Sequence, residues 1–571
     1  MTPSLYPRFM QHMKWWGWGD DGVAFSHEDK PSLGPFIRKH LQVDVGVKPV
    51  PPVAFEQLDI PEPSLSGELR AALDDAVGSA KVSTDALDRV VHARGKSLRD
   101  LVRIRSGDLG RLPDVVVRPA DEDAVTAVLE AALEADAVVI PFGGGTNISG
   151  SLEAPEAESR TVISVDLGAL NKVLAIDADS RIARVQAGVL GPHLEEQLNA
   201  RGWTIGHFPD SFNHSTLGGW IATRSSGMQS DKYGDIADLT RAVRMATPVG
   251  MLATRPVPTT STGPSVREMV LGSEGRLGII TEATVHVHRL PEQRTIIGYL
   301  FPTWEEGLAA MREISASDAS PTVTRVSDSC ETAFSFATKK ADTRLDRVKS
   351  RALKEFLERR KGYDLESMCL AFIGYEGSKA HVALQRRLVG KFVKRHGGLS
   401  IGTSPGELYD QKKFDTPYIR DFLLDRGTLG DVSETSAPWS LLPGLYDNAS
   451  AAAHGAFGEL GVNGYLMCHM SHSYHAGACL YFTFAFKPSG QREPLEEYDV
   501  VKSAVQQAFV DSGATLSHHH AVGTEHAQWL EQDISAPGVA MLKSLFDGFD
   551  PGGNLNPGKI VGERSVESPT R

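Results

Sequence analysis

The strongest chemical feature of the sequence is the run Ser517-His518-His519-His520 near the C-terminal end. Because imidazole titrates near neutral pH, these histidines are candidate general bases or acids. If the run is extended, side-chain alternation places His518 and His520 on one face and His519 on the other. Two alternatives stay open: a structural polar cluster, and a metal pair completed by Glu525 or His526. We favour acid–base chemistry and predict no metal.

Three further reactive side chains lie among apolar neighbours. Tyr481 is either a core tyrosine with a satisfied hydroxyl or a catalytic group. Arg325 and Arg420 each need an anion in such surroundings. That anion is either an internal carboxylate, such as Asp328 or Asp421, or a substrate phosphate, which suits the planar guanidinium.

Four loops rich in glycine and small hydroxyl residues occur between residues 141 and 280. The first, Gly143-Gly144-Gly145-Thr146, follows a predicted strand, and its missing Cβ atoms let backbone N–H groups converge on an anion. It has neither the G-x-G-x-x-G pattern of a Rossmann site nor the GK[ST] ending of a P-loop. The loops at 209–219, 223–227 and 272–280 are also rich in small residues, which leave their backbone groups accessible to a ligand. Together they suit a flat, extended cofactor.

Composition narrows the class of protein. The chain has 571 residues, of which 41% are hydrophobic, and a net charge of −13, which argues against a nucleic-acid-binding protein. Its four cysteines form no disulfide framework, so a reducing compartment is favoured. No window approaches the ~18 apolar residues that span a bilayer. We therefore expect a cytoplasmic protein.

Hydrophobic periodicity predicts how these residues are positioned. Residues 67–101 have helical spacing, and residues 113–145 read as a β-α-β unit with parallel strands, its helix capped by Asp121 or Asp123. Residues 294–490 alternate strands and helices, including a basic helix near 342–361, and predict an antiparallel sheet backed by helices. The aromatic segment Lys14–Asp20 is expected to pack onto the main domain, with membrane contact as the alternative. The predicted domains are 1–105 (helical and aromatic), 106–292 (cofactor-binding), 293–495 (cap) and 496–571 (returning to the cofactor site).

Eight motifs give a family resemblance. They are KWWGWGD, PFGGGT, PDSFNHSTLGGWIATRSSGM, YGDIADL, GSEGRLGIITEATV, ETSAPW, AGACLYFTFAF and SHHHAVG, spread over residues 14–550 in unbroken order. They resemble the vanillyl-alcohol oxidase type of FAD-binding flavoproteins and, within it, the alkyldihydroxyacetonephosphate synthases, with this chain as a bacterial homologue. The resemblance implies an α+β fold: a two-subdomain FAD-binding part plus a cap with an antiparallel sheet covered by helices.

The resemblance also implies the cofactor and its contacts. The pyrophosphate of FAD would lie on the 143–146 loop, the flavin and ribityl chain against 210–216 and 223–226, and the adenine side near 274–280. Some members of the wider fold attach flavin covalently through a histidine where this chain has Thr146-Asn147, so non-covalent FAD is expected; His207 or His214 would be the exceptions. The predicted cofactor-binding residues are Pro141, Phe142, Gly143, Gly144, Gly145, Thr146, Asn147, Asp210, Ser211, Phe212, Asn213, His214, Ser215, Thr216, Thr223, Arg224, Ser225, Ser226, Glu274, Gly275, Arg276, Leu277, Gly278, Ile279 and Ile280.

The implied activity replaces the acyl group of acyl-dihydroxyacetone phosphate with a long-chain alcohol, redox-neutral through a flavin adduct. By the same resemblance Tyr481 is catalytic, and Arg325 and Arg420 serve activity or substrate binding; the Glu434 carboxylate would orient a histidine or an arginine. The predicted catalytic set is Tyr481, His518, His519, His520 and Arg325.

Other expectations follow from that activity. An apolar tunnel within 294–490, peripheral membrane contact and a homodimer are expected, and no nucleic acid. The alternatives are an FAD-linked oxidase or dehydrogenase of a 2-hydroxy acid or alcohol, and a flavin-binding protein without catalysis. The buried titratable groups argue against the last, because a pure binder gains nothing from their desolvation.

Overall fold

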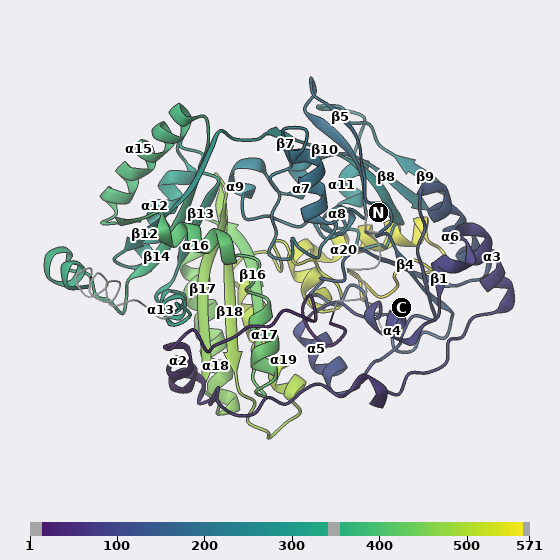
Figure 1. Ribbon diagram of the computed structural model, residues 1–571, viewed down its shortest axis with the longest axis horizontal. Coiled ribbons are helices and arrows are strands. Elements are labelled where there is room, and N and C mark those ends of the chain that lie inside the picture. The colour runs from purple at the N-terminus through teal and green to yellow at the C-terminus, as the bar shows by residue number, and fades with distance from the viewer. Residues whose placement is uncertain (1–13, 341–353, 563–571) are drawn as a thin grey trace, which may run out of the picture.

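The computed structural model describes residues 14–340 and 354–562. Two halves lie side by side (Figure 1): one built on two smaller sheets from the first half of the chain, the other on a single large sheet from residues 293–486. The C-terminal residues, yellow in the figure, lie with the first half: Leu530 and Phe546 pack in its core, and Leu555 pairs with Val139 in one of its sheets. The predicted α+β fold with a separate cap is confirmed.

The first sheet contains the predicted β-α-β unit. Its strand order is β1-β2-β4-β3, and β2 and β3 both run parallel to β4. The helix between β2 and β3 begins after Asp121, whose carboxylate accepts the Ala124 N–H. The last part of the chain extends this sheet, because Val139 N–H donates to the Asn554 carbonyl. The elements are α3 (Gly67–Val77), β1 (Val82–Ser83), α4 (Ala86–Val91), α5 (Leu98–Arg105), β2 (Val115–Val117), α6 (Glu122–Glu134), β3 (Val138–Phe142) and β4 (Val162–Asp166).

The second sheet is antiparallel, with strand order β5-β6-β10-β8-β9. The second and third glycine-rich loops flank the helix α8 (Leu217–Thr223), and the second loop contacts the first glycine-rich loop, which follows the first sheet. The elements are β5 (Val173–Asp177), β6 (Ile182–Gln186), α7 (Gly191–Asn199), β7 (Trp203–Thr204), α8 (Leu217–Thr223), α9 (Ser230–Tyr233), α10 (Ile236–Leu239), β8 (Thr240–Thr247), β9 (Gly250–Ala253), α11 (Val266–Val270), β10 (Ile279–His286) and β11 (His288–Arg289).

The cap is the predicted antiparallel sheet, with strand order β15-β12-β14-β13-β17-β18-β16. The strand at 429–438, which contains all but the last residue of the ETSAPW motif, was not predicted as a strand. Of the predicted basic helix near 342–361, residues 341–353 lie outside the described residues, as do residues 1–13. The elements are β12 (Gln293–Phe301), α12 (Trp304–Ser315), β13 (Val323–Ser327), α13 (Ser329–Ala337), β14 (Cys369–Gly377), α15 (Lys379–Arg395), β15 (Leu399–Gly402), α16 (Ser404–Lys412), α17 (Tyr418–Leu424), β16 (Leu429–Pro438), α18 (Leu442–Leu460), β17 (Gly464–Ser473) and β18 (Gly477–Phe486).

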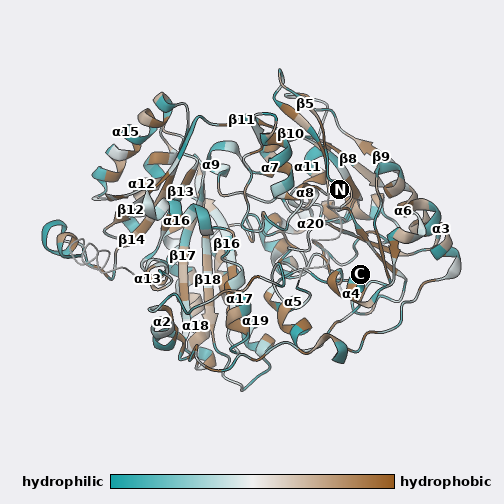
Figure 2. Ribbon diagram, viewed as in Figure 1, coloured by the Kyte–Doolittle hydropathy of each residue, from teal (hydrophilic) through white to brown (hydrophobic). Residues whose placement is uncertain are grey.

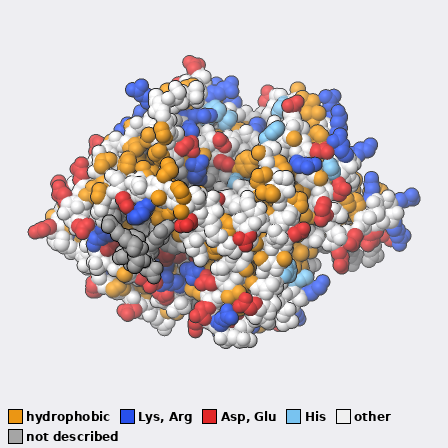
Figure 3. All heavy atoms as spheres, turned by 180° about the vertical axis from the view of Figure 1, so that it is seen from behind, with side chains coloured by type: hydrophobic (Ala, Val, Ile, Leu, Met, Phe, Trp, Pro, Cys, Tyr) orange, Lys and Arg blue, Asp and Glu red, His pale blue; other side chains and the backbone are white. Residues whose placement is uncertain are grey.

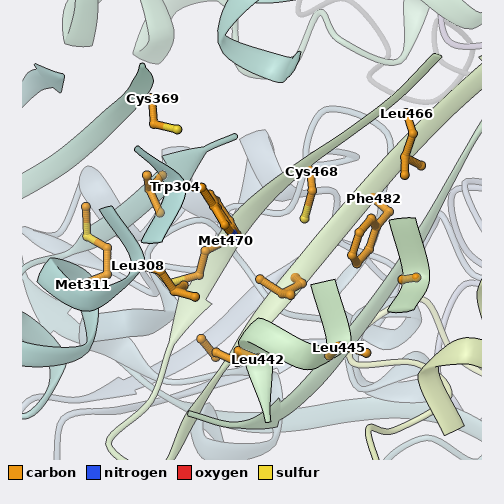
Figure 4. Packing of buried hydrophobic residues seen from close by; sticks show 14 of the residues in the cluster. Trp304, Leu308, Met311, Cys369, Leu442, Leu445, Leu466, Cys468, Met470 and Phe482 are labelled. Atoms are coloured by element: carbon orange, nitrogen blue, oxygen red, sulfur yellow. The ribbon is translucent and has the colours of Figure 1, made fainter. Parts of the chain in front are cut away.

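Side-chain alternation decides which face of the cap sheet is core. Leu480 and Phe482 on β18 are fully buried beneath the covering helices, while Tyr481 and Thr483 point to the opposite face. Figure 4 shows this core, in which Phe482 packs with Leu445 of α18 and Cys468 of β17. Apolar colour follows the strands, and polar colour follows the outer loops and helix faces (Figure 2). The face away from the helices is therefore free to form a site.

The N-terminal aromatic segment packs on the body of the protein, as expected. Trp15 lies edge-on to Phe55 at 5.8 Å, and Trp18 is buried against His214. The helix α2 (Leu33–Leu41) then contacts α13 and β17. Within the described part of the chain, no helix combines the length and apolarity needed to cross a membrane.

The chain ends in α19 (Pro494–Asp511), the histidine run and α20 (Leu530–Phe549). Seen from the back (Figure 3), basic side chains gather at the end of the molecule where α15 lies, and acidic side chains are scattered over the rest of that face.

Candidate active site

A cavity of about 580 Å³ lies between the glycine-rich loops and the open face of the cap sheet. Its walls include residues from all four predicted loops, from β17 and β18, and from the histidine run. Segments that are hundreds of residues apart in the chain thus meet in one chamber, of the size and mixed lining typical of ligand sites.

The first glycine loop begins where β3 ends, so it lies at the carboxyl end of a parallel strand. A Cβ atom on Gly144 would lie 1.6 Å from the His214 carbonyl oxygen, and one on Gly143 would lie 2.4 Å from Oγ1 of Thr216. Only glycine allows this contact between the first and second loops. The resulting cradle offers backbone and small hydroxyl groups, which fits the pyrophosphate of FAD.

Most of the predicted cofactor residues line this cavity. The seven that do not are Phe212, Asn213, His214, Arg224, Arg276, Leu277 and Ile279. These seven side chains stand outside the cavity wall, and their contact with the cofactor stays a prediction. Phe212, for example, stacks on Trp220 and Phe414, whereas exposed Arg224 pairs with Glu268.

The buried side chain of Glu274 holds the fourth glycine-rich loop against neighbouring segments. Its buried carboxylate accepts hydrogen bonds from the Ser151 hydroxyl and from the N–H groups of Val522 and Gly523. Burial raises the pKa of Glu274. This residue therefore joins the loop to the segment that follows the histidine run.

The histidine run is not extended, so the predicted alternation is wrong. It bends around Glu434 of β16, whose carboxylate accepts the backbone N–H groups of His518, His519 and His520 at 2.8–3.1 Å and the Ser517 hydroxyl at 2.6 Å. As a result His519 and His520 line the cavity, whereas His518 does not. Of the two partners proposed for Glu434, the structure selects the histidines.

Charge separates the roles of the two cavity histidines. Burial lowers the pKa of His519, but the Glu434 carboxylate, 3.3 Å from its Nδ1, raises it to above its ordinary value overall. Burial and the charge of His519 hold the pKa of His520 well below its ordinary value. The pKa of Glu434 is held well below its usual range despite burial, chiefly by His519 and His520. His519 is thus suited to carry positive charge, whereas His520 is held neutral.

Tyr481 lies against these histidines. Its ring stacks between His519 (centroids 5.9 Å apart, 20° between planes) and His469 (4.9 Å, 19°), with His520 edge-on at 5.5 Å. Burial, with Asp210 and Glu434 nearby, holds the pKa of Tyr481 well above its ordinary value. Its hydroxyl is therefore a proton donor at neutral pH.

The two arginines lie in the cavity wall, but not with the carboxylates considered from the sequence. Arg325 donates to Glu331 Oε1 at 2.6 Å, not to Asp328, which caps α13 instead. Arg420, on α17, has a buried Nε with no hydrogen-bond partner among the described residues. Its neighbour Asp421 is taken by Lys14 Nζ at 3.3 Å and the Trp18 N–H at 3.0 Å. Arg420 is therefore available to an anion in the cavity.

Several site residues were not predicted. Trp18, Glu331, His469 and His472 all line the cavity. The last two had a signal in the sequence, since MCHMSHS places polar side chains inside an otherwise apolar strand. Trp18 lies in the KWWGWGD motif, but the sequence could not place it at the site, because its position depends on a contact with Asp421 about 400 residues away.

Comparison with known proteins places this geometry in a family. Residues 113–254 match the family described as "FAD binding domain", and residues 290–560 match "FAD linked oxidases, C-terminal domain". The alkyldihydroxyacetonephosphate synthase of Dictyostelium discoideum is 36% identical over 582 residues, covering 98% of this chain and 95% of the relative. The chain belongs to the alkyldihydroxyacetonephosphate synthase family.

Solved structures agree with this family. An alkyldihydroxyacetonephosphate synthase structure aligns with a TM-score of 0.83 at 35% identity, covering 96% of this chain and 99% of the other. A 4-ethylphenol oxidase from Gulosibacter chungangensis aligns at 14% identity with a TM-score of 0.65, over 88% of this chain and 100% of the other, and this likeness shows the shared fold alone. The predicted family and its FAD-binding part are thereby confirmed. The roles of individual residues stay predictions.

Proposed function

We propose that the protein replaces the acyl group of an acyl-dihydroxyacetone phosphate with a long-chain alcohol, without net oxidation or reduction. The observation that carries the proposal is the buried Arg420 Nε, which has no hydrogen-bond partner among the described residues, in the same cavity as the glycine cradle, Tyr481 and the histidines. A phosphate group on a small ketone would accept a hydrogen bond from Arg420. The carbon next to the ketone would then lie near Tyr481, His519 and His520.

Each polar residue has a role that its surroundings support. Arg420 binds the phosphate, and Arg325, already balanced by Glu331, orients it. His520 accepts the proton from the carbon next to the ketone, while charged His519 stabilises the negative charge that develops. The Tyr481 hydroxyl donates a hydrogen bond to the leaving carboxylate. When bound, FAD supplies an electron-accepting ring against which the carbon is activated.

The cavity continues into an apolar end that suits a long alkyl chain. Its walls there come from Phe36, Ile37 and Leu41 of α2, and from Phe334 and Leu423 of the cap. The sequence predicted a tunnel within 294–490; the α2 residues are an addition to it. Binding the alkyl chain of the alcohol beside Tyr481 and the histidines places the alcohol oxygen near the reacting carbon.

The test is an exchange assay on purified, flavin-replete protein. Acyl-dihydroxyacetone phosphate and a fatty alcohol should yield free fatty acid and an ether-linked product in equal amounts while the flavin stays oxidised. If instead a 2-hydroxy acid or alcohol bleaches the flavin and no ether forms, the protein is the FAD-linked oxidoreductase that the sequence left as the alternative.

A variant of Arg420 tests the proposed binding of the substrate phosphate. Arg420→Ala should raise KM by roughly 10- to 150-fold, the loss of a charged hydrogen bond of about 1.5–3 kcal/mol, and leave flavin content unchanged. Arg426→Ala is the control, because Arg426 follows the C-terminal end of the same helix, stacks on Phe422 and does not line the cavity. Loss of flavin from Arg420→Ala would move the residue from the substrate to the cofactor.

We further propose non-covalent FAD, a cytoplasmic homodimer and peripheral contact with membranes that hold its amphiphilic substrates. Non-covalent binding is supported by the position of His207 and His214, which are buried and do not line the cavity. Acid precipitation should leave all flavin in the supernatant; flavin in the pellet would contradict it. Sedimentation with and without lipid vesicles tests the assembly and the membrane contact.

A further inference from the structure

Beside the cavity, two histidines of the run meet a histidine and a cysteine from the cap sheet. Potential ligand atoms of His472, Cys479, His518 and His519 all lie within 4.8 Å of one another. The sequence offered only Glu525 and His526 to complete a metal site with the histidine run. The fold supplies two other ligands from β17 and β18 instead.

The cap sheet presents its two ligands side by side. His472 and Cys479 are direct cross-strand partners. Between Met470 and His472 the register shifts, so Ser471 is an extra residue in β17. Without this bulge, His472 would point to the core face with Met470; the bulge turns it to the same face as Cys479 and Tyr481.

Hydrogen bonds indicate which ring nitrogen of two histidines carries the lone pair. His472 Nε2 lies 3.1 Å from the Gly227 carbonyl, which only accepts, so Nδ1 carries the lone pair. Tyr474 donates to Asp235 and therefore accepts from His518 Nε2 at 2.5 Å, which again leaves Nδ1. The chain from His518 through Tyr474 to Asp235 resembles the carboxylate support of metal-binding histidines.

We propose that His472, Cys479, His518 and His519 form a binding site for Zn²⁺ or a similar thiophilic divalent ion, and that its occupation inhibits the enzyme. Three imidazoles and one thiolate supply four nitrogen and sulfur ligands, the ligand number and atom types of tetrahedral zinc sites. Nδ1 of His518 and His519 are already 2.9 Å apart. Ligand atoms about 2.0–2.3 Å from an ion stand about 3.3–3.8 Å from one another, and the ligand atoms of this group already lie within 4.8 Å of one another.

The binding step is balanced by protons. Cys479 gives up its thiol proton to solvent as the sulfur–metal bond forms, and any proton on a ligating nitrogen leaves in the same way. The ion displaces the Ser471 hydroxyl, which lies 2.7 Å from His472 Nδ1. His519 is then held by the metal and no longer available beside Tyr481, so turnover stops while flavin stays bound.

The alternative group of Glu434, His519 and His520 is less suitable. It offers three ligands and no sulfur, and Glu434 is already occupied by three backbone N–H groups and a hydroxyl. The cysteine-containing group is therefore the one to test.

The test uses Co²⁺ as a spectroscopic probe on flavin-replete protein without substrate, so its outcome does not depend on the proposed reaction. One Co²⁺ per chain should give intense tetrahedral d–d bands at wavelengths beyond the flavin absorption, displaced by Zn²⁺. Cys479→Ser should weaken binding by at least about tenfold. Cys330→Ser, a cysteine of α13 outside the cluster, should bind as the wild type does.

Activity gives the second readout. Zn²⁺ should inhibit alcohol exchange in the wild type, a chelator should restore it, and Cys479→Ser should resist the same concentration. If Cys479→Ser loses flavin, His472→Gln replaces it in the cobalt titration, with the same tenfold loss expected. Weak octahedral bands alone, or equal affinity in the wild type and these variants, would overturn the proposal.

Discussion

Glu434 and His519 form the central ion pair of the site, with a carboxylate oxygen 3.3 Å from Nδ1 of the ring. The same carboxylate orders the backbone of the histidine run. One buried charge thus sets both the shape of the run and the protonation of its members.

Replacing this charge should disable the site. Glu434→Gln cannot balance His519 and offers an N–H₂ group where backbone N–H groups need an acceptor. We expect kcat to fall about 100-fold or more and the free energy of unfolding to fall by about 3 kcal/mol. Rates on flavin-replete protein and denaturant unfolding measure both. Glu459→Gln, at an exposed pair with Arg492, should change neither; unchanged rates in Glu434→Gln would remove the pair from the mechanism.

The N-terminal segment should affect substrate binding from a distance. Lys14→Met leaves the buried Asp421 carboxylate without its cation, so neighbouring Arg420 turns toward it and leaves the phosphate. KM should rise about tenfold, with flavin content unchanged. The double variant Lys14→Met/Asp421→Asn removes the unpaired charge and should restore KM. A double variant as impaired as the single one would show that Lys14 acts in another way.

The glycine cradle should not tolerate even one methyl group. Gly144→Ala would force the new Cβ into the His214 carbonyl, so the first two loops must separate. We expect colourless apoprotein, measured by the flavin-to-protein absorbance ratio. Gly444→Ala, where a Cβ meets no atom within 4 Å, is the matched control. A yellow Gly144→Ala protein would place the cofactor elsewhere.

Stability should depend on pH through Asp231, which joins α9 to the cap. Its carboxylate accepts the Ser473 N–H at 2.8 Å and the Thr324 hydroxyl. Burial raises its pKa from 3.8 to about 7. A raised carboxyl pKa gives stability that is complete below the unfolded value and is lost as pH rises toward 7, at about 1.4 kcal/mol per pH unit.

Asp231→Asn should therefore gain on the wild type as pH rises. The amide still accepts from Ser473 and donates to Thr324, and it has no charge to bury. We compare the free energy of unfolding of Asp231→Asn with that of the wild type by denaturant titration at pH 4 and at pH 8. The difference in favour of the variant should be a few kcal/mol larger at pH 8 than at pH 4. Asp179→Asn, at an exposed turn, should show no such trend. A constant difference between Asp231→Asn and the wild type would contradict the shift.

Local patterns predicted much of the fold. The β-α-β unit, the alternating strands of the cap and the glycine-rich loops follow from periodicity and from residues that allow close backbone contact. The strand at 429–438 escaped prediction because its residues, such as Glu434 and Thr435, are polar yet buried by partners from elsewhere.

The arrangement of the site could be predicted only in part. The sequence singled out Tyr481, the histidines and both arginines, but not their partners. The bend of the histidine run depends on Glu434, which is 84 residues from His518. Arg325 pairs with Glu331 of α13, whereas Asp328, the carboxylate considered from the sequence, caps that helix. Such contacts arise from tertiary packing, which residue type and spacing do not specify.

The most direct test of the account is proton removal by the histidine wall. Acyl-dihydroxyacetone phosphate carrying deuterium on the carbon between the ketone and the acyl oxygen is incubated with flavin-replete protein, and deuterium in water is measured. The wild type should release it during turnover, and His520→Gln should do so at about one hundredth of the rate or less. Equal release by both proteins would contradict the assignment of His520 as the base.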